Sequence, residues 1–169
     1  MGSDAATRVL VLADTHVVPA GRRQLPHPVY DLLEGADLVL HAGDLTSPDV
    51  LHELRAFAPV EAVLGNNDHE LVGILPETAT VVVDGYRIGV VHDAGLEPGR
   101  AHRMRRRFPD ASMVVFGHSH LPCDEVGEDG QRLFNPGSPT WKRRAPTHTV
   151  GILEIRAGAL VDHRIIDVG

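Results

Sequence analysis

Residues 9–16 read Val-Leu-Val-Leu-Ala-Asp-Thr-His, so an uninterrupted apolar run leads directly into polar side chains. A short apolar run of this kind predicts a buried β-strand. Four further apolar runs, at residues 38–40, 62–64, 88–91 and 113–116, also lead into polar motifs. In an open α/β fold, ligands bind outside the carboxyl ends of the strands, so we expect the five polar tips to converge on one crevice.

The polar tips are rich in side chains that bind metal ions. Seven of them are suitable ligands: Asp14, His16, Asp44, Asn66, His92, His118 and His120. They offer oxygen and imidazole nitrogen but no sulfur, which suits Mn, Fe, Ni or Zn. Seven ligands exceed the needs of one ion, and a carboxylate such as Asp44 can bridge two, so the pattern predicts two divalent ions about 3.5 to 4 Å apart. That spacing fits a phosphate and favours a binuclear hydrolase centre.

In chain order the tips form the motifs D-x-H, G-D, G-N-x-D, H and G-H-x-H. This ordered set resembles the calcineurin-like metallophosphoesterase superfamily. The small size and the Asn-Pro-Gly-Ser at residues 135–138 resemble the compact YfcE-type phosphodiesterases, which share a fold with the retromer subunit Vps29. The resemblance covers residues 8–156 and implies an α/β fold, a four-layer α/β/β/α sandwich of two mixed sheets.

The resemblance also implies a role for each motif residue. Asp14, His16 and His120 would bind one ion, Asn66, His92 and His118 would bind the other, and Asp44 would bridge them. Asp68 would sit behind the site and orient or protonate a neighbouring group. Mn is the expected metal, with Ni, Fe and Zn as alternatives, and the resemblance favours a dimer or tetramer.

Two positions depart from the family pattern. Many relatives carry a histidine directly after the asparagine ligand, where it can protonate the leaving oxygen, but this chain has Asn67. An amide is no general acid, so the change favours phosphodiester over phosphomonoester hydrolysis, and we expect Asn67 to contact the substrate instead. The second departure is Asp93, which follows His92 where glycine is usual. Asp93 could hydrogen-bond to a metal ligand, select substrates by charge, or point to solvent.

Each motif alone also has a purely structural explanation. His92 could be a core histidine, Asp44 could cap the helix expected near Pro48, and residues 66–68 could form an Asx-rich turn. Five motifs in the correct order favour function over these coincidences. The expected activity is metal-assisted hydrolysis of a small-molecule phosphodiester; a phosphomonoesterase and a Vps29-like protein-interaction module remain the alternatives.

Charge and aromatic content limit the possible partners. A formal charge of −7 opposes binding to extended nucleic acid, and only 4% of the residues are aromatic. Basic residues nevertheless cluster at Lys142, Arg143 and Arg144, beside Trp141. The resemblance places this loop near the crevice, where Lys142 or Arg143 would hold the non-reacting phosphate substituent. A solubilising loop is the alternative.

The chain organisation is simple. Residues 1–169 are expected to form one domain, with residues 1–7 loose, and no segment is predicted to span a membrane or to serve as a signal peptide. The single Cys123 allows no internal disulfide, so the cytoplasm is the default compartment. Three βα units are expected first, with helices at residues 28–34, 48–57 and 98–107 or 100–107. Hairpin turns are expected at residues 84–85, 129–130 and 157–158.

Overall fold

A computed structural model describes residues 4–169 as ten strands, three α-helices and two 3-10 helices. The first half contains β1 (Thr7–Leu12), α1 (His27–Glu34), β2 (Leu38–His41), α2 (Pro48–Arg55), β3 (Val60–Ala62), η1 (His69–Leu71), β4 (Thr78–Val83) and β5 (Tyr86–Val91). The second half contains α3 (Arg100–Arg107), β6 (Met113–Val115), β7 (Cys123–Val126), η2 (Glu128–Gly130), β8 (Arg132–Asn135), β9 (Thr149–Arg156) and β10 (Ala159–Asp167).

The strands form two mixed sheets of five strands each. The first has the order β10-β9-β1-β2-β3, in which β1, β2 and β3 are parallel and β9 and β10 are antiparallel to their neighbours. The second has the order β4-β5-β6-β8-β7, with β5, β6 and β8 parallel and an antiparallel strand at each edge. The predicted mixed-sheet architecture is therefore confirmed.

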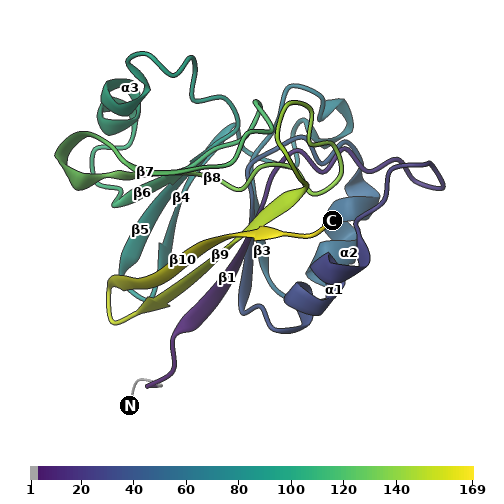
Figure 1. Ribbon diagram of the computed structural model, residues 1–169, viewed down its shortest axis with the longest axis horizontal. Helices are drawn as coiled ribbons and strands as arrows, with labels where there is room; N and C mark the ends of the chain where they lie inside the picture. The colour runs from purple at the N-terminus through teal and green to yellow at the C-terminus, as the bar shows by residue number, and fades with distance from the viewer. Residues whose placement is uncertain (1–3) are drawn as a thin grey trace.

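Helices cover the outer face of each sheet, which makes four layers (Figure 1). Along β1, Leu10 and Leu12 point to the side of α1 and α2, where they join Val29 and Leu54 in one buried cluster. The alternate residues of β1 point to the other sheet and form the buried layer between the two sheets. This period of two is what a strand buried on both faces requires.

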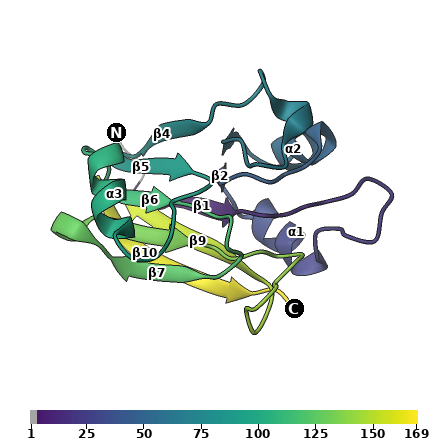
Figure 2. The ribbon, with the colours of Figure 1, turned by 90° about the horizontal axis from the view of Figure 1, so that it is seen from above.

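The third helix covers the second sheet. Met104 and Phe108 pack with Val114, Phe116 and Leu133 of the second sheet. Figure 2 shows α3 lying across the strands β5, β6 and β7. The fold is therefore the α/β/β/α sandwich that the sequence predicted. None of the helices within residues 4–169 is long and apolar enough to cross a membrane.

Several expected boundaries differ from the observed ones. Only β1 and β2 are followed by α-helices in the first sheet, because the chain leaves the short β3 through η1 and enters the second sheet at β4; the expectation of three leading βα units was wrong. The first strand begins at Thr7, inside the stretch expected to be loose, and residues 1–3 lie outside the described part of the chain. The second helix ends at Arg55, before the expected residue 57.

The hairpin turns and the cap of α2 are formed by residue types that favour these conformations. Asp84 and Gly85, with φ of 45° and 84°, connect β4 and β5, while residues 157–158 connect β9 and β10 as predicted. The turn at residues 129–130 lies between β7 and β8. Ser47, not Asp44, caps α2, since its hydroxyl accepts a hydrogen bond from the Asp49 amide at 3.1 Å. This leaves Asp44 free for another role.

Candidate metal centre

The polar motifs lie at one edge of the sandwich, in the loops that follow parallel strands of both sheets. Asp14 and His16 follow β1, Asp44 follows β2 and Asn66 follows β3 in the first sheet. His92 follows β5 directly, and the loop after β6 carries His118 and His120. The two stacked sheets bring these loops together, as the strand-end argument predicted.

The backbone in these loops is unusual. Five of the predicted ligands have positive φ: Asp14 (52°), His16 (40°), Asp44 (60°), His118 (72°) and His120 (61°). Residues other than glycine rarely adopt this left-handed conformation, which costs on the order of 1 kcal/mol or more for each residue. Such strain persists only where the surroundings impose it, and it concentrates at functional sites.

Close backbone approach explains two of the glycines in the motifs. A Cβ on Gly65 would lie 2.1 Å from Oδ1 of Asp44. Gly43 has a φ of 96°, and a Cβ there would lie 2.7 Å from Nδ1 of His92. Any larger residue at either position would displace Asp44 or His92, so these glycines allow the loops to pack against each other.

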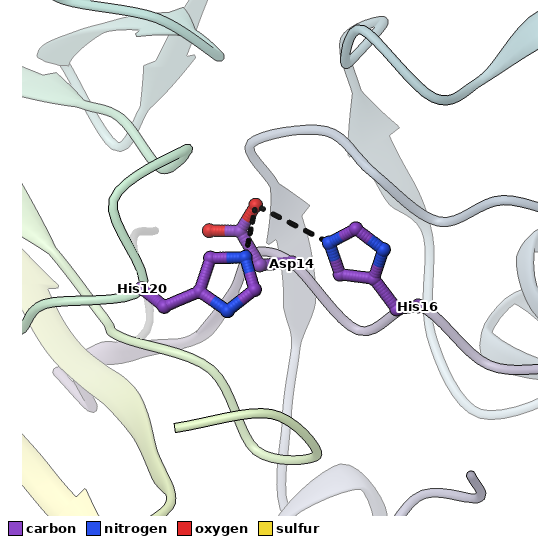
Figure 3. Close-up of side chains that lie close together, drawn as sticks. All are labelled: Asp14, His16 and His120. Atoms are coloured by element: carbon purple, nitrogen blue, oxygen red, sulfur yellow. Dashed lines mark ion pairs between the residues drawn. The ribbon is translucent and has the colours of Figure 1, made fainter. Parts of the chain in front are cut away.

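One cluster joins the first and last motifs (Figure 3). Oδ1 of Asp14 lies 3.9 Å from Nε2 of His16 and 3.5 Å from Nε2 of His120. All three atoms are buried, and none has a hydrogen-bond partner. Buried polar atoms left without partners are costly, so their convergence fits a bound cation. Carboxylate oxygen and imidazole nitrogen are suitable donors for a divalent metal ion, and the three residues therefore fit one.

A second cluster lies beside the first. Oδ1 of Asn66 is 3.0 Å from Nε2 of His92 and 3.3 Å from Nδ1 of His118. His92 is buried, while His118 is about half exposed at the surface. The amide oxygen and the two imidazole nitrogens form another oxygen and nitrogen donor set.

Asp44 lies between the two clusters. Its Oδ2 atom is 3.3 Å from Nε2 of His16 and 3.4 Å from Nε2 of His92. Asp14 also approaches the second cluster, since its Oδ1 atom is 3.9 Å from Nε2 of His92. A single carboxylate in contact with both histidines has the position that a bridging ligand needs.

Backbone carbonyls orient two of the imidazoles. Nδ1 of His92 lies 2.7 Å from the Ala42 carbonyl oxygen, and Nδ1 of His120 contacts the carbonyl oxygen of Trp141. A proton on Nδ1 satisfies each carbonyl and leaves the lone pair of Nε2 directed at the carboxylates. These carbonyls were not predicted, because a backbone group has no sequence signal.

Asp68 and Asn67 hold Asp44 from behind. The buried carboxylate of Asp68 accepts hydrogen bonds from the amides of Asp44 (2.8 Å), Thr46 (2.6 Å) and Gly65 (2.8 Å). The backbone amide of Asn67 donates to Oδ1 of Asp44, and its side-chain amide donates to Oδ2, each at 2.9 Å. Both residues therefore position the Asp44 loop.

Burial and neighbouring charges shift the pKa values of three residues in the site. Burial raises the pKa of Asp14 to about 7. Although burial opposes it, the nearby imidazoles of His16 and His92 and the Asn67 amide hold the pKa of the Asp44 carboxyl far below its usual value. Burial, together with the charge of Arg143, lowers the pKa of His120 to about 4, which keeps its imidazole neutral.

Comparison with known proteins places this geometry in a family. The family model of the calcineurin-like phosphoesterase superfamily domain matches residues 7–158. The chain belongs to the calcineurin-like phosphoesterase superfamily. A probable metallophosphoesterase from Methanothermobacter thermautotrophicus is 37% identical over 161 residues, which cover 94% of this chain and 91% of that protein.

Solved structures with the same fold are also similar to this phosphoesterase. Vps29 from Entamoeba histolytica, solved with zinc, has a TM-score of 0.74 at 24% identity, covering 96% of this chain and 99% of Vps29. A conserved uncharacterized protein from Streptococcus pneumoniae, described as a predicted phosphoesterase, has a TM-score of 0.73 at 22% identity, covering 98% and 91% of the two chains. At these identities the likeness establishes the fold.

A cleft of about 410 Å³ opens beside the second cluster of the phosphoesterase site. Its wall includes Asn66, His92, His118, Glu77, Asp93 and Arg107. Asp93 is exposed, and its Oδ2 atom lies 4.0 Å from Nε2 of His118, while Oδ1 accepts a hydrogen bond from the Gly95 amide. Asp93 therefore lines the cleft while its side chain stays exposed to solvent.

The basic loop lies beside His118 and the first cluster. Arg143 approaches the His118 carbonyl oxygen at 3.4 Å, whereas the Lys142 ammonium donates to the Pro146 carbonyl oxygen at 3.3 Å. Arg143 is therefore the better placed of the two expected substrate-binding cations. Trp141 packs against the site itself, with its ring centroid 5.2 Å from that of His16.

Other residues that support the site were missed by sequence analysis. His41 is fully buried, with Nε2 3.0 Å from the Thr15 hydroxyl and Nδ1 accepting a hydrogen bond from the Gly43 amide. Ser138 donates to the Asp14 carbonyl oxygen at 2.7 Å. The Asn-Pro-Gly-Ser sequence could have pointed to Ser138, but a single apolar-flanked histidine gave no reason to select His41.

Proposed function

We propose that this protein hydrolyses phosphodiester bonds in a small phosphorylated substrate or nucleotide with the help of two divalent metal ions. One observation carries the proposal: the buried, unpartnered atoms of Asp14, His16 and His120 converge beside Asp44, which also contacts His92. This arrangement is unfavourable without a cation and suitable with one. Membership of the phosphoesterase superfamily agrees with it.

The two clusters suggest the two ligand sets. Asp14, His16 and His120 would hold one ion, Asn66, His92 and His118 would hold the other, and Asp44 would bridge them. Mn is the proposed ion, with Ni, Fe and Zn as alternatives that the same donors accept. The zinc-bound Vps29 structure supports the capacity of this fold to hold a metal.

The protein groups mainly position the reactants. When bound, the ions would supply positive charge for the phosphoryl oxygens and would lower the pKa of water enough to make hydroxide available at neutral pH. Asp68 and Asn67 fix the Asp44 carboxylate, and the Ala42 and Trp141 carbonyls fix the imidazole rings. Such prearrangement reduces the reorganisation needed in the transition state.

Two features support a diester as the substrate. Asn67 carries no titratable proton, so it cannot protonate the leaving oxygen of a poor leaving group. Asp93 places a carboxylate on the cleft wall beside His118, where it repels a dianionic monoester more than a singly charged diester. Arg143 approaches the His118 carbonyl oxygen and would hold the non-reacting substituent.

A screen with reconstituted metals tests the proposal. Metal-free protein is loaded separately with Mn, Ni, Fe or Zn and assayed with bis-p-nitrophenyl phosphate and with p-nitrophenyl phosphate. Metal content is measured by elemental analysis on the same samples. We expect two ions per chain and faster turnover of the diester. Faster turnover of the monoester would instead indicate a phosphomonoesterase.

A Vps29-like interaction module is the second candidate, favoured by the TM-score of 0.74 to Vps29. The screen also distinguishes this candidate. A protein that retains no metal after purification with Mn, and turns over neither ester, would support the interaction module. The dimer or tetramer and the cytoplasmic location expected from the sequence remain predictions, and gel filtration with light scattering measures the oligomeric state.

A further inference from the structure

The only tryptophan of the chain, Trp141, forms part of the wall of the proposed metal centre. Its ring centroid lies 5.2 Å from that of His16 and 5.3 Å from that of His120, both in edge-on contact. The Trp141 amide donates to the Ser138 hydroxyl at 2.9 Å. The indole is therefore fixed directly beside one of the two proposed metal sites.

Two arginines from distant parts of the chain stack on this ring. The guanidinium carbon of Arg23 lies 4.3 Å from the ring centroid, and that of Arg143 lies 4.6 Å from it. Within residues 4–169, neither arginine forms an ion pair with a carboxylate. Two like charges on one ring repel each other, so an anion bound beside them would relieve the repulsion.

A second cavity lies beside Arg23, one of the two arginines. Its volume is about 360 Å³, its basic side chains are Arg22 and Arg23, and Thr140, His148 and Gly169 also line it. The cleft beside the second cluster contains the carboxylates of Glu77 and Asp93 together with Arg107. The cavity beside Arg23 is therefore more basic than the cleft.

We propose that Arg23 and Arg143, held on Trp141, form a binding site for a second phosphate group carried by the substrate. The proposal rests on the phosphodiesterase function above and narrows it to diesters whose substituent bears a further phosphate. Guanidinium groups bind phosphate through paired, charge-assisted hydrogen bonds. The carboxylates of the cleft orient such a substrate, since its extra phosphate is repelled from that side and attracted to the arginines.

Trp141 allows binding to be measured apart from catalysis. The probes are thymidylyl-thymidine (TpT) and its 5′-phosphorylated form (pTpT), which differ by one terminal phosphate. Each is titrated into metal-free protein while the fluorescence of the single tryptophan is recorded. We expect pTpT to bind at least about tenfold more tightly than TpT, although the protein carries a net charge of −7.

Variants assign this preference to the two arginines. Arg23→Gln and Arg143→Gln should each reduce the preference for pTpT towards onefold, while Arg23→Lys, which keeps the charge but loses the planar fork, should retain part of it. Arg106→Gln is the matched control, because Arg106 is exposed on α3, which covers the outer face of the second sheet. The control should keep the full preference. Far-UV circular dichroism confirms that each variant is folded.

The outcomes separate this proposal from the proposed function. Equal affinities for TpT and pTpT, or a preference that survives in both glutamine variants, would overturn the phosphate site. Hydrolysis of both dinucleotides by the Mn-loaded protein together with equal affinities would overturn the phosphate site alone. A preference that depends on the arginines, without any hydrolysis in Mn, would support the phosphate site and contradict the phosphodiesterase function.

Discussion

Asn67 binds both carboxylate oxygens of Asp44, through its backbone amide to Oδ1 and its side-chain amide to Oδ2, each at 2.9 Å. This pair gives Asn67 a role in addition to the substrate contact expected from the sequence. Asp44 contacts histidines of both clusters, so an asparagine that fixes its carboxylate also fixes the geometry between the two proposed ions. Residues that orient ligands in this way contribute to metal affinity.

Replacing Asn67 should weaken metal binding. Asn67→Ala removes the side-chain amide and keeps the backbone hydrogen bond, so we expect Mn affinity to fall by about 10-fold or more. Isothermal titration calorimetry measures the affinity. The control is Asp110→Asn, at an exposed position, which should keep the Mn affinity of the wild type. Equal Mn affinity in Asn67→Ala and the wild type would show that Asn67 does not position Asp44.

Asp14 should be needed for activity but not for folding. Asp14→Asn keeps the size of the side chain and removes its charge, and we expect bis-p-nitrophenyl phosphate turnover to fall at least about 100-fold. Asp110→Asn, at an exposed position, is the control and should keep full turnover. Undiminished turnover by folded Asp14→Asn would rule out the proposed ligand set.

In the absence of metal, Asp14→Asn should be more stable than the wild type. The pKa of Asp14 is raised to about 7 by burial, so above pH 7 the folded metal-free protein contains a buried charge that the unfolded chain exposes to water. Asparagine removes that cost. Metal-free Asp14→Asn should therefore have a higher Tm than the metal-free wild type at pH 8. An unchanged or lower Tm would contradict this account.

Asp93 should select diesters over monoesters. Asp93→Asn keeps an oxygen to accept the Gly95 amide and removes only the charge. Because this side chain is 60% exposed, solvent screens its charge, and we expect the ratio of monoester to diester turnover to rise by only about two- to threefold. Asp110→Asn again serves as control. A ratio unchanged from the wild type would show that Asp93 selects no substrate.

His41 should make the protein sensitive to acid. Burial, together with the charge of His92, lowers the pKa of His41 from 6.5, the value of a free histidine, to about 3. The stability that depends on neutral His41 is complete above pH 6.5 and is lost as the pH falls from 6.5 towards 3, because the unfolded chain takes up the proton first.

Replacing His41 should make the stability of the protein depend less on pH. His41→Asn removes the titrating group. Between pH 6.5 and 4, the free energy of unfolding of the variant should therefore fall less steeply than that of the wild type, and the two slopes should differ by up to about 1.4 kcal/mol per pH unit. Urea unfolding in the presence of a chelator measures both proteins, and taking their difference removes the contributions of Asp14 and His120. Equal slopes would show that His41 already carries a proton in the folded protein.

The sequence was sufficient to predict the architecture. Apolar runs such as residues 9–13 define buried strands, and their carboxyl ends must meet at one edge of the sandwich. The seven predicted ligands were brought together for that reason. The third βα unit was not predicted correctly, because β3 has only three residues and its sequence does not indicate that the chain then enters a second sheet.

The supporting contacts could not be predicted from sequence. The carbonyl groups of Ala42 and Trp141 contact His92 and His120, but every residue has a carbonyl, so no residue type marks them. Arg23 meets Trp141 only because the loop after β1 folds back to the loop after β8. Contacts of this kind depend on tertiary packing and not on local pattern.

Anomalous diffraction from crystals grown with Mn²⁺ tests the central claim most directly, because it locates each ion without reference to activity. The account predicts two Mn peaks, one among Asp14, His16 and His120 and the other among Asn66, His92 and His118, with Asp44 between them. The peaks should lie about 3.5 to 4 Å apart. No peak, or a single peak outside these clusters, at saturating Mn²⁺ would contradict the binuclear centre.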